Sequence, residues 1–313
     1  MKISRKVPIA LFAVALTLGL SGLFLTLPRA HAAQSTVNLQ TATQFAILAG
    51  TPGITDVANS STIIGSVGLA PATGAGIGLL CPQVSGNIYS VDAAGPLPCR
   101  LTNGPLMVTA KNDLTAAYID AAGRTPVTTL GTELGGTTVT AGVYASDATT
   151  FQITAGAGPL VINGQGDPSS VFIFEMGFNG TGLTVGPGST VSLINGASPC
   201  NIFWRVDTAS IDTTAVFKGN VLALTSITVN NGANIVGRLL ARNGTVTLNN
   251  DTISAAVCGA TTTSSTGSTG VVPKLPNTGA TSANHTIVWA MDSAGIALIA
   301  AFAIYSVRKK KTN

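Results

Sequence analysis

Histidine and charge are scarce in this chain. Among its 313 residues there are two histidines, His31 and His285, and only 9% of the residues are charged. Both histidines lie in terminal segments that we expect to be removed, so the remaining segment, 33–278, has none. A Ser-His-acid triad, a histidine general base and a histidine-ligated metal are thereby excluded. Because the four cysteines include no CxxC pair, a zinc site is also a poor interpretation. We expect no cofactor and no metal.

The first 32 residues have the pattern of a signal peptide. Basic residues stand between positions 2 and 6, an apolar run covers 7–27, and residues 30–32 (AHA) provide a small-x-small cleavage site. The polar, Thr-rich sequence that follows favours cleavage over an uncleaved membrane anchor. We therefore expect an exported protein whose mature chain begins at Ala33.

The C-terminal end has three features in a fixed order. A pentapeptide is followed by an apolar run at 286–307, long enough to span a bilayer, and by four basic residues at 308–311. Together they (275–313) resemble the LPXTG sorting signal of Gram-positive wall proteins, in which a sortase cleaves after the Thr and joins it to peptidoglycan. We expect covalent attachment to the cell wall after a transient stay in the membrane; a helix that simply remains in the membrane is the alternative. The pentapeptide consists of Leu275, Pro276, Asn277, Thr278 and Gly279.

The net charge of the whole chain reflects its two targeting segments. Residues 33–278 hold eight of the 16 lysines and arginines but 11 of the 12 acidic residues, a net charge of −3 rather than +4. Nucleic acid is therefore not an expected partner. The membrane is expected as a partner only through the C-terminal helix before sorting, and the chain is expected to be monomeric. A Gly/Ser/Thr-rich stretch at 259–274 is interpreted as a flexible linker.

Four cysteines in an exported chain predict two disulfides. Three pairings are possible. We favour Cys81–Cys99, which would close a Pro- and Gly-rich cap loop at about 71–100, and Cys200–Cys258, which would hold the end of the domain. Each of these pairs would fix an otherwise loose edge.

Two consecutive stretches near the end of the mature segment can be laid over each other. Residues 221–231 and 239–250 each contain an apolar strand, a corner, a strand that alternates hydroxyl and aliphatic side chains, and an Asn pair. Thr228 and Thr247 are 19 positions apart. A period of about 20 residues built from short strands is typical of a β-solenoid. Because side chains alternate along a strand, these two threonines point away from the aliphatic residues that precede them.

One segment has the spacing of an amphipathic helix. Between about residues 105 and 122, apolar side chains recur at three- and four-residue steps, and Gly123 provides a C-terminal stop. We expect this helix to pack along one wall of the solenoid; a separate small subdomain is the alternative. The apolar side chains are Leu106, Met107, Ala110, Leu114, Ala117 and Ala121.

A series of ordered motifs carries a family resemblance. They are FAILAG (45–50), DAAGRT (120–125), GVY (142–144), GDPSSVFIF (166–174), NIFWRV (201–206), GNVLA (219–223) and GRLLAR (237–242). In this order they resemble the microbial ice-binding family known as DUF3494, over roughly residues 33–256. The resemblance implies a mainly β fold: a discontinuous right-handed β-helix of triangular section with one long α-helix alongside. It also implies adsorption to ice through one flat face of a domain that we place at 33–258.

The expected ice-binding face is the outward wall of hydroxyl-rich strands. Rungs stack about 4.7–4.9 Å apart and alternate residues of a strand about 6.6–6.8 Å apart, spacings at which hydroxyls can anchor surface water in an ordered pattern. The register follows from side chains expected inside: Phe151, Leu183, Ile211, Ile227 and Val246. The predicted face consists of Thr150, Gln152, Thr184, Ser210, Asp212, Ser226, Thr228, Thr245 and Thr247. Asp212 fits least well, because a carboxylate suits a rim better than a flat centre.

Three functions compete at this point. The first is a non-enzymatic ice-binding protein on the cell wall, acting as an antifreeze, a recrystallisation inhibitor or an ice adhesin. The second is a wall-anchored adhesin that binds glycan or protein through the same solenoid. The third is a β-helix polysaccharide lyase or hydrolase with Asp207 and Asp212 as paired carboxylates, although two acids at a corner are more often solvated turn residues. Since aromatic residues for sugar stacking are few, 5% of the chain, we favour the first.

Overall fold

The computed structural model describes residues 34–176 and 182–258. Within them the fold is mainly β, with parallel sheets and a single α-helix, α2 (Gly104–Ala122), as predicted. No helix in these ranges has the length and apolar character needed to cross a membrane. The signal peptide (1–32), the linker (259–274) and the sorting signal with its apolar run (275–313) lie outside the described residues and remain predictions.

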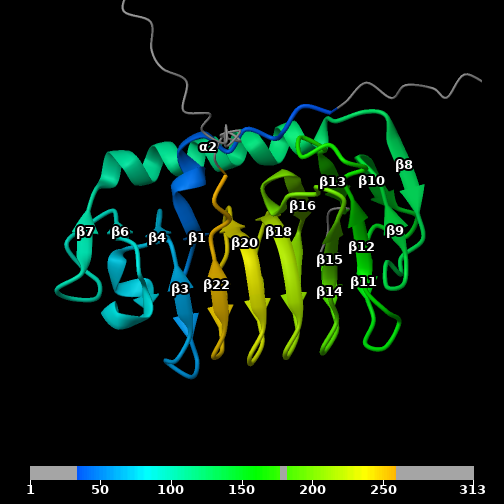
Figure 1. Ribbon diagram of the computed structural model, residues 1–313. Helices are drawn as coiled ribbons and strands as arrows, with labels where there is room; N and C mark the ends of the chain where they lie inside the picture. The colour runs from blue at the N-terminus through cyan, green and yellow to red at the C-terminus, as the bar shows by residue number, and fades with distance from the viewer. Residues whose placement is uncertain (1–33, 177–181, 259–313) are drawn as a thin grey trace, which may run out of the picture. The chain divides into compact units, whose positions relative to one another are not determined.

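The described strands pair in parallel and form three sheets (Figure 1). In order of pairing, the seven-stranded sheet consists of β11 (Phe151–Ile153), β14 (Gly182–Val185), β17 (Thr208–Ile211), β19 (Ile227–Val229), β21 (Val246–Leu248), β2 (Ile54–Asp56) and β5 (Ile77–Gly78). The three-stranded sheet consists of β15 (Val191–Ile194), β12 (Leu160–Asn163) and β9 (Thr138–Val139).

The main path of the twelve-stranded sheet is β7 (Arg100–Thr102), β6 (Ile88–Ser90), β4 (Ser66–Leu69), β1 (Phe45–Ala49), β20 (Asn234–Ala241), β18 (Val216–Ala223), β16 (Ile202–Val206), β13 (Phe172–Glu175), β10 (Gly142–Ser146) and β8 (Val127–Leu130). Beside this path, β22 (Thr252–Ser254) pairs with β20 and with β3 (Thr62–Ile64). Short 3-10 helices lie at Gln40–Gln44, Gly74–Gly76, Cys81–Gln83 and Pro199–Asn201.

The order of strands in the stack differs from their order in the sequence. Strand β1 pairs with β20, placing Ile47 opposite Leu239, and β2 and β3 pair with β21 and β22 in the same way. The N-terminal segment therefore stacks on the last rungs of the chain. Helix α2 then leads from β7 at one end of the molecule to β8 at the other, as Figure 1 shows.

Two long strands bend at paired glycines. Gly219 in β18 lies in register with Gly237 in β20, and their φ angles are 115° and 157°. A Cβ atom at Gly237 would lie 1.8 Å from the carbonyl oxygen of Gly219, so only glycine fits there. Before the bend Phe217 points into the core, and after it Leu222 points toward α2. Each of these strands thus contributes to two differently directed surfaces.

The core consists of two apolar clusters. The larger one fills the space between the sheets and contains stacked aromatic rings, with the Phe174 and Trp204 centroids 4.0 Å apart and Phe217 5.3 Å beyond Trp204. The smaller one lies under α2 and includes Leu48, Leu222 and Leu240. Burial of these side chains, at roughly 25 cal/mol per Å² of apolar surface, is the main stabilising contribution to the stack.

Helix α2 begins at a side-chain cap and is buried along one face. Asn103 accepts a hydrogen bond from the Leu106 backbone N–H at 3.1 Å. The predicted apolar stripe is buried except for Leu106, which is half-exposed, and Tyr118 is buried in addition. Tyr118 lies between Arg205 and Arg242, whose guanidinium carbons are 4.7 and 4.8 Å from its ring centroid. An aromatic ring between two cations was not foreseen from the apolar spacing.

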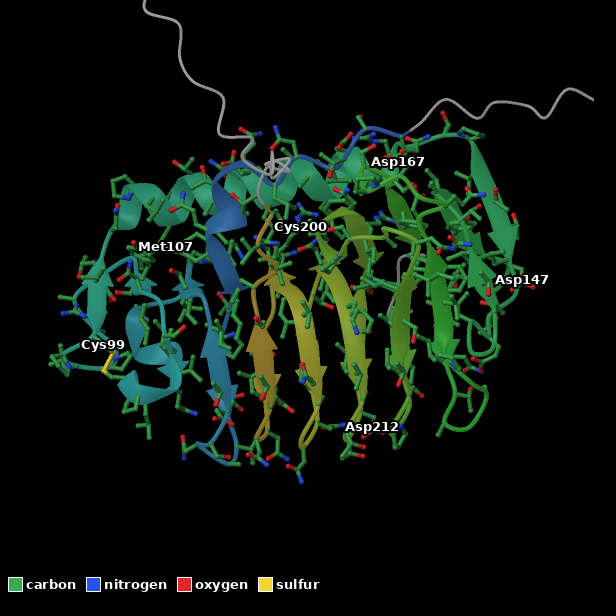
Figure 2. The ribbon with its side chains drawn as sticks, viewed as in Figure 1. Cys99, Met107, Asp147, Asp167, Cys200 and Asp212 are labelled. Carbon is green, nitrogen blue, oxygen red and sulfur yellow. A yellow bond between two sulfur atoms is a disulfide. The ribbon has the colours of Figure 1, made fainter. Side chains whose placement is uncertain are left out.

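Both favoured disulfides are present in the structure. Cys81 and Cys99 are joined across the cap loop, where Figure 2 shows the bond at Cys99 in yellow. Cys200 and Cys258 are joined across 58 positions and tie the last described residues to the turn before β16. The pairing prediction is therefore confirmed, and no described cysteine is free.

Candidate functional site

One surface of the molecule is built from strands with regular alternation. Along the seven-stranded sheet, one set of side chains lies in the core and the side chains between them point outward. The residues from which the register was predicted are at most 2% exposed. They are Phe151, Leu183, Ile211, Ile227 and Val246. We call the outward side chains of this sheet the seven-stranded face.

The outward side chains form two rows across the strands. Pairing places in one row Gln152, Thr184, Ser210, Thr228, Thr247 and Thr55. Two residues earlier in the chain, the second row contains Gly182 and Thr208 within their strands and Thr150, Ser226 and Thr245 directly before theirs. Neighbouring hydroxyls touch within these rows: Thr55 Oγ1 donates to Thr247 Oγ1 at 3.3 Å, and Thr245 Oγ1 donates to Ser226 Oγ at 3.4 Å. The strands thus bring eight of the nine predicted side chains together in register.

Asp212 is the predicted residue that lies outside both rows. It follows the last residue of β17, at the strand end where Figure 2 labels it. Its Oδ1 accepts hydrogen bonds from the Thr213 backbone N–H at 2.7 Å and from Asn230 Nδ2 at 3.2 Å. The carboxylate is thus held within the turn at the rim of the face.

Two residues of the rows were missed by sequence reasoning. Thr208 lies beside Ser226, since the next residue, Ala209, donates its backbone N–H to the Ser226 carbonyl, and the same two-residue alternation that selected Ser210 could have identified it. Thr55 stands beside Thr247, but it belongs to an N-terminal strand outside the recognised repeats. No local signal in the sequence shows that these two threonines are neighbours.

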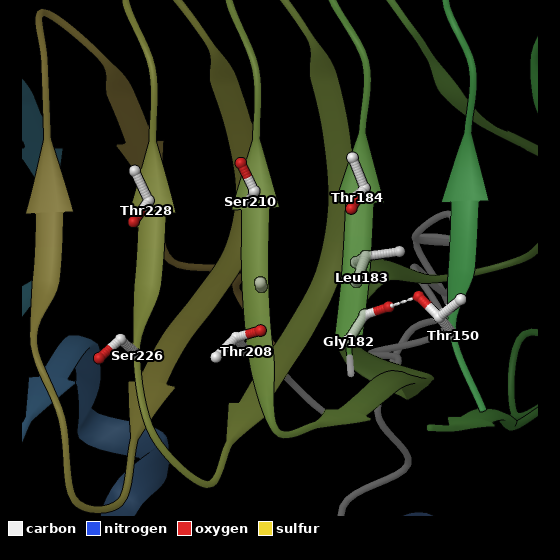
Figure 3. Close-up of a pocket in the computed structure, with 9 residues that line it drawn as sticks. Thr150, Gly182, Leu183, Thr184, Thr208, Ser210, Ser226 and Thr228 are labelled. Atoms are coloured by element: carbon white, nitrogen blue, oxygen red, sulfur yellow. Dashed lines mark hydrogen bonds between the residues drawn. The ribbon is translucent and has the colours of Figure 1, made fainter. Parts of the chain in front are cut away.

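A shallow hollow interrupts the second row at Gly182 (Figure 3). Gly182 is required at this position, because a Cβ would lie 1.9 Å from the Thr208 carbonyl oxygen of the neighbouring strand. The Thr150 hydroxyl donates to the Gly182 carbonyl at the edge of the hollow. Leu183 and Ala209 also line the hollow, and its hydroxyl side chains are those of Thr150, Thr184, Thr208, Ser210, Ser226 and Thr228.

Charge is confined to the ends and rim of the seven-stranded face. Glu133 forms a bridge beside Gln152, and its Oε2 accepts a hydrogen bond from Gln152 Nε2 at 3.3 Å. Partial burial raises the pKa of Glu133, but hydrogen bonds from Thr154 and the Gly135 backbone outweigh it and keep the pKa below its ordinary value. Glu133 is therefore a fixed anion at one end, while both rows contain only uncharged residues.

The carboxylates considered for catalysis are engaged in local contacts. Asp207 is 6% exposed and accepts a hydrogen bond from Thr225 Oγ1 at 3.0 Å. Asp212 lies at the opposite end of β17, bonded within its own turn. The two groups thus stabilise corners at the two ends of one strand.

Comparison with known proteins places this architecture in a family. The family described as Ice-binding-like matches residues 47–254. An ice-binding protein of Colwellia sp. is 42% identical over 223 residues, covering 70% of this chain and 83% of the relative. An ice-binding protein of Flavobacterium frigoris (strain PS1) is 40% identical over 222 residues, covering 69% of this chain and 75% of the relative.

Solved structures agree with the sequence comparison. The DUF3494 domain of Shewanella frigidimarina ice-binding protein 1 is similar with a TM-score of 0.63 and 29% identity, over 73% of this chain and 100% of that one. An ice-binding protein from an Antarctic biological consortium has a TM-score of 0.62 and 35% identity, over 72% of this chain and 94% of that one. This chain belongs to the ice-binding-like, DUF3494-type family.

Proposed function

We propose that this protein binds ice through the seven-stranded face. The observation that carries the proposal is the row from Thr184 to Thr55, in which side chains of adjacent strands stand in register without a charged group. Adjacent strands are about 4.7–4.9 Å apart, so the row repeats at a constant interval. Hydroxyls can anchor water at that interval, and the threonine methyl groups limit how strongly the water is drawn away from a lattice position. The ice-binding relatives support the same ligand.

A flat and rigid wall suits ice because a crystal surface cannot adapt to its partner. We propose that the sheets are the walls of a right-handed β-helix of triangular section. The seven-stranded sheet would be one wall, and the sheet region covered by α2 a second. The bridge between Thr190 and Val216 continues the three-stranded sheet into the first halves of β18 and β20, which would make the third wall. Each wall would be stiffened by continuous parallel pairing.

Display on the cell wall is the second part of the proposal. Residues 33–258 would be exported and joined to peptidoglycan at Thr278, with residues 259–274 as the connecting linker. The order of the terminal motifs in the sequence is the support for this step. In that position the protein would hold the cell against ice or restrain ice growth at its surface, with no enzymatic step.

A direct test places the purified full-length protein with a small ice crystal just below its melting point. We expect faceting and arrested growth. Replacing Thr228 by Tyr should remove most of this effect, since a ring in the middle of the row would lift its neighbours from a rigid lattice. The matched control is Thr129→Tyr, at an exposed position of β8 in the other large sheet, which should leave the effect unchanged.

The second candidate function, an adhesin for glycan or protein, differs only in its ligand. The polar hollow at Gly182 is the observation that favours it, because sugar hydroxyls could bind there. Free ice growth at high protein concentration, together with binding to a glycan array that Thr228→Tyr abolishes, would replace the ice-binding proposal by this one.

A further inference from the structure

A second outward surface has the same kind of order as the seven-stranded face. Across β18, β20, β22 and β3, which lie side by side in Figure 1, pairing aligns Val216, Asn234, Thr252 and Thr62 in one row. Two residues further along the same strands, a second row contains Lys218, Val236, Ser254 and Ile64. We call these two rows the second face. Their side chains are exposed or half-buried, as those of the seven-stranded face are.

The second face rests on a rigid interior. Between its outward side chains, Phe217, Ile235, Ile253 and Ile63 are fully buried in the core. These inward residues are themselves paired from strand to strand. The outward hydroxyl, amide and β-branched groups are therefore held at the strand interval of about 4.7–4.9 Å.

The single cation of these two rows lies back against the protein. Lys218 Nζ donates to the carbonyl oxygen of Val191 at 3.4 Å, so its ammonium group is directed along the sheet. The other seven residues of the second face carry no charge. An ordered layer of water over this surface would meet methyl and neutral polar groups, as over the seven-stranded face.

The two faces are joined by a ladder of neutral polar side chains. At the corner, Ser60 Oγ donates to Asn250 Oδ1 at 3.1 Å, and Asn250 Nδ2 donates to Asn231 Oδ1 at 3.0 Å. Asn250 lies between Thr247 of the first face and Thr252 of the second. These neutral polar groups connect the two faces at the corner, and the carboxylate of Asp212 lies in the neighbouring turn, where it accepts a hydrogen bond from Asn230.

We propose that the second face also binds ice and that it selects a crystal plane different from the one bound by the seven-stranded face. The inference rests on the proposed function. Because the chain turns between the two sheets, as at residues 230–233 between β19 and β20, and the core fixes both sheets, one molecule presents two rigid arrays in two directions. A single lattice plane cannot be matched to both, so each array would adsorb to its own plane.

The experiment uses the fluorescently labelled full-length protein and a single-crystal ice hemisphere. Fluorescence on the hemisphere shows which crystal planes have adsorbed the protein. The variants are Thr228→Tyr in the seven-stranded face, Thr252→Tyr in the second face, their combination, and the control Thr129→Tyr. We expect each face variant to lose a different part of the wild-type pattern, the double variant to lose all of it, and the control to match the wild type. The melting temperatures of the variants, measured on the same samples, should equal that of the wild type, because all substituted positions lie at the surface.

The possible failures are distinguishable. If Thr252→Tyr gives the wild-type pattern while Thr228→Tyr loses all adsorption, the second face does not bind ice and the proposed function stands. If the wild type labels no plane, the proposed function fails, and this inference fails with it. If Thr252→Tyr unfolds the protein, Ser254→Tyr in the neighbouring row of the same face takes its place, and the same pattern decides.

Discussion

Thr55 and Thr247 touch through their hydroxyl groups at 3.3 Å, although 192 positions separate them in the sequence. The contact exists because β2 pairs with β21, so that the N-terminal segment adds strands to the end of the C-terminal stack. The seven-stranded face is therefore assembled from both ends of the domain. Its length depends on correct docking of the N-terminal segment.

Replacing Thr55 by Tyr should weaken ice-growth inhibition while leaving the fold intact. The side chain is exposed and Tyr is a good strand residue, so stability should shift by no more than about 0.5 kcal/mol. The ring would nevertheless stand above the row that continues to Thr247 and Thr228. Ice-growth rate and protein melting temperature, measured on one preparation, test this expectation. Inhibition equal to that of the wild type would show that the binding surface ends at β21.

Much of this arrangement could be predicted from local sequence pattern. The alternation of Ile227 with Thr228, and of Val246 with Thr247, is enough to assign inside and outside, because neighbouring side chains of a strand face opposite ways. The two disulfides followed from the need to fix loose edges in a chain that is expected to be exported. The helix followed from three- and four-residue spacing.

What could not be predicted depends on contacts between distant segments. The place of Thr55 is set by the pairing of β2 with β21, for which no short-range pattern exists. Tyr118 was overlooked because its contacts with Arg205 and Arg242 join segments that are far apart in the sequence. Asp212 was included because strand alternation was extended one residue past the end of β17. Contacts between distant segments thus decided the first two cases, and the hydrogen bonds of a turn decided the third.

Trp204→Ala should be strongly destabilising. The indole ring is fully buried between Phe174 and Phe217, and its Nε1 donates to the Lys218 carbonyl at 3.1 Å. Removing it leaves a cavity in the stacked core and an unsatisfied carbonyl, at a cost of about 3–5 kcal/mol. Urea unfolding measures the loss. Trp204→Phe, which keeps a ring in the stack, should retain a larger part of the stability.

Removing the disulfide between Cys200 and Cys258 should lower stability by about 2–4 kcal/mol. The bond closes a long loop, 58 positions, and holds the last described strand, β22, near the turn before β16. The double variant Cys200→Ser/Cys258→Ser avoids leaving a free thiol. Chemical denaturation under non-reducing conditions gives the difference, with Cys81→Ser/Cys99→Ser as the comparison. An unchanged unfolding midpoint would mean that strand pairing alone holds β22 in place, without the disulfide.

Thr278→Ala should redirect the protein from the cell wall to the membrane. In the proposed sorting signal the cleaved bond would follow Thr278, and without cleavage the apolar run at 286–307 would remain as an anchor. Fractionation of cells followed by immunoblotting separates the two locations. A conservative change outside the motif, Thr266→Ser in the linker, serves as the control. Wall attachment that persists unchanged in Thr278→Ala would exclude sortase as the route.

The free energy of unfolding of the wild type should fall between about pH 4.5 and pH 7. In Glu175→Gln it should fall less over the same range. Burial raises the pKa of Glu175 from its ordinary 4.5 to about 7, while Arg205, opposite in the next strand, acts in the other direction. The folded protein thus keeps a proton that the unfolded chain has already lost, so the stabilisation is complete below pH 4.5 and disappears as the pH rises to 7. Asp251, whose pKa burial raises to about 6, titrates equally in both proteins, and the comparison removes its contribution. Urea unfolding at several pH values should therefore show the wild type losing stability relative to Glu175→Gln across this window and no further above it. Parallel curves would mean that Glu175 is ionised in the folded state throughout, with Arg205 stabilising its charge.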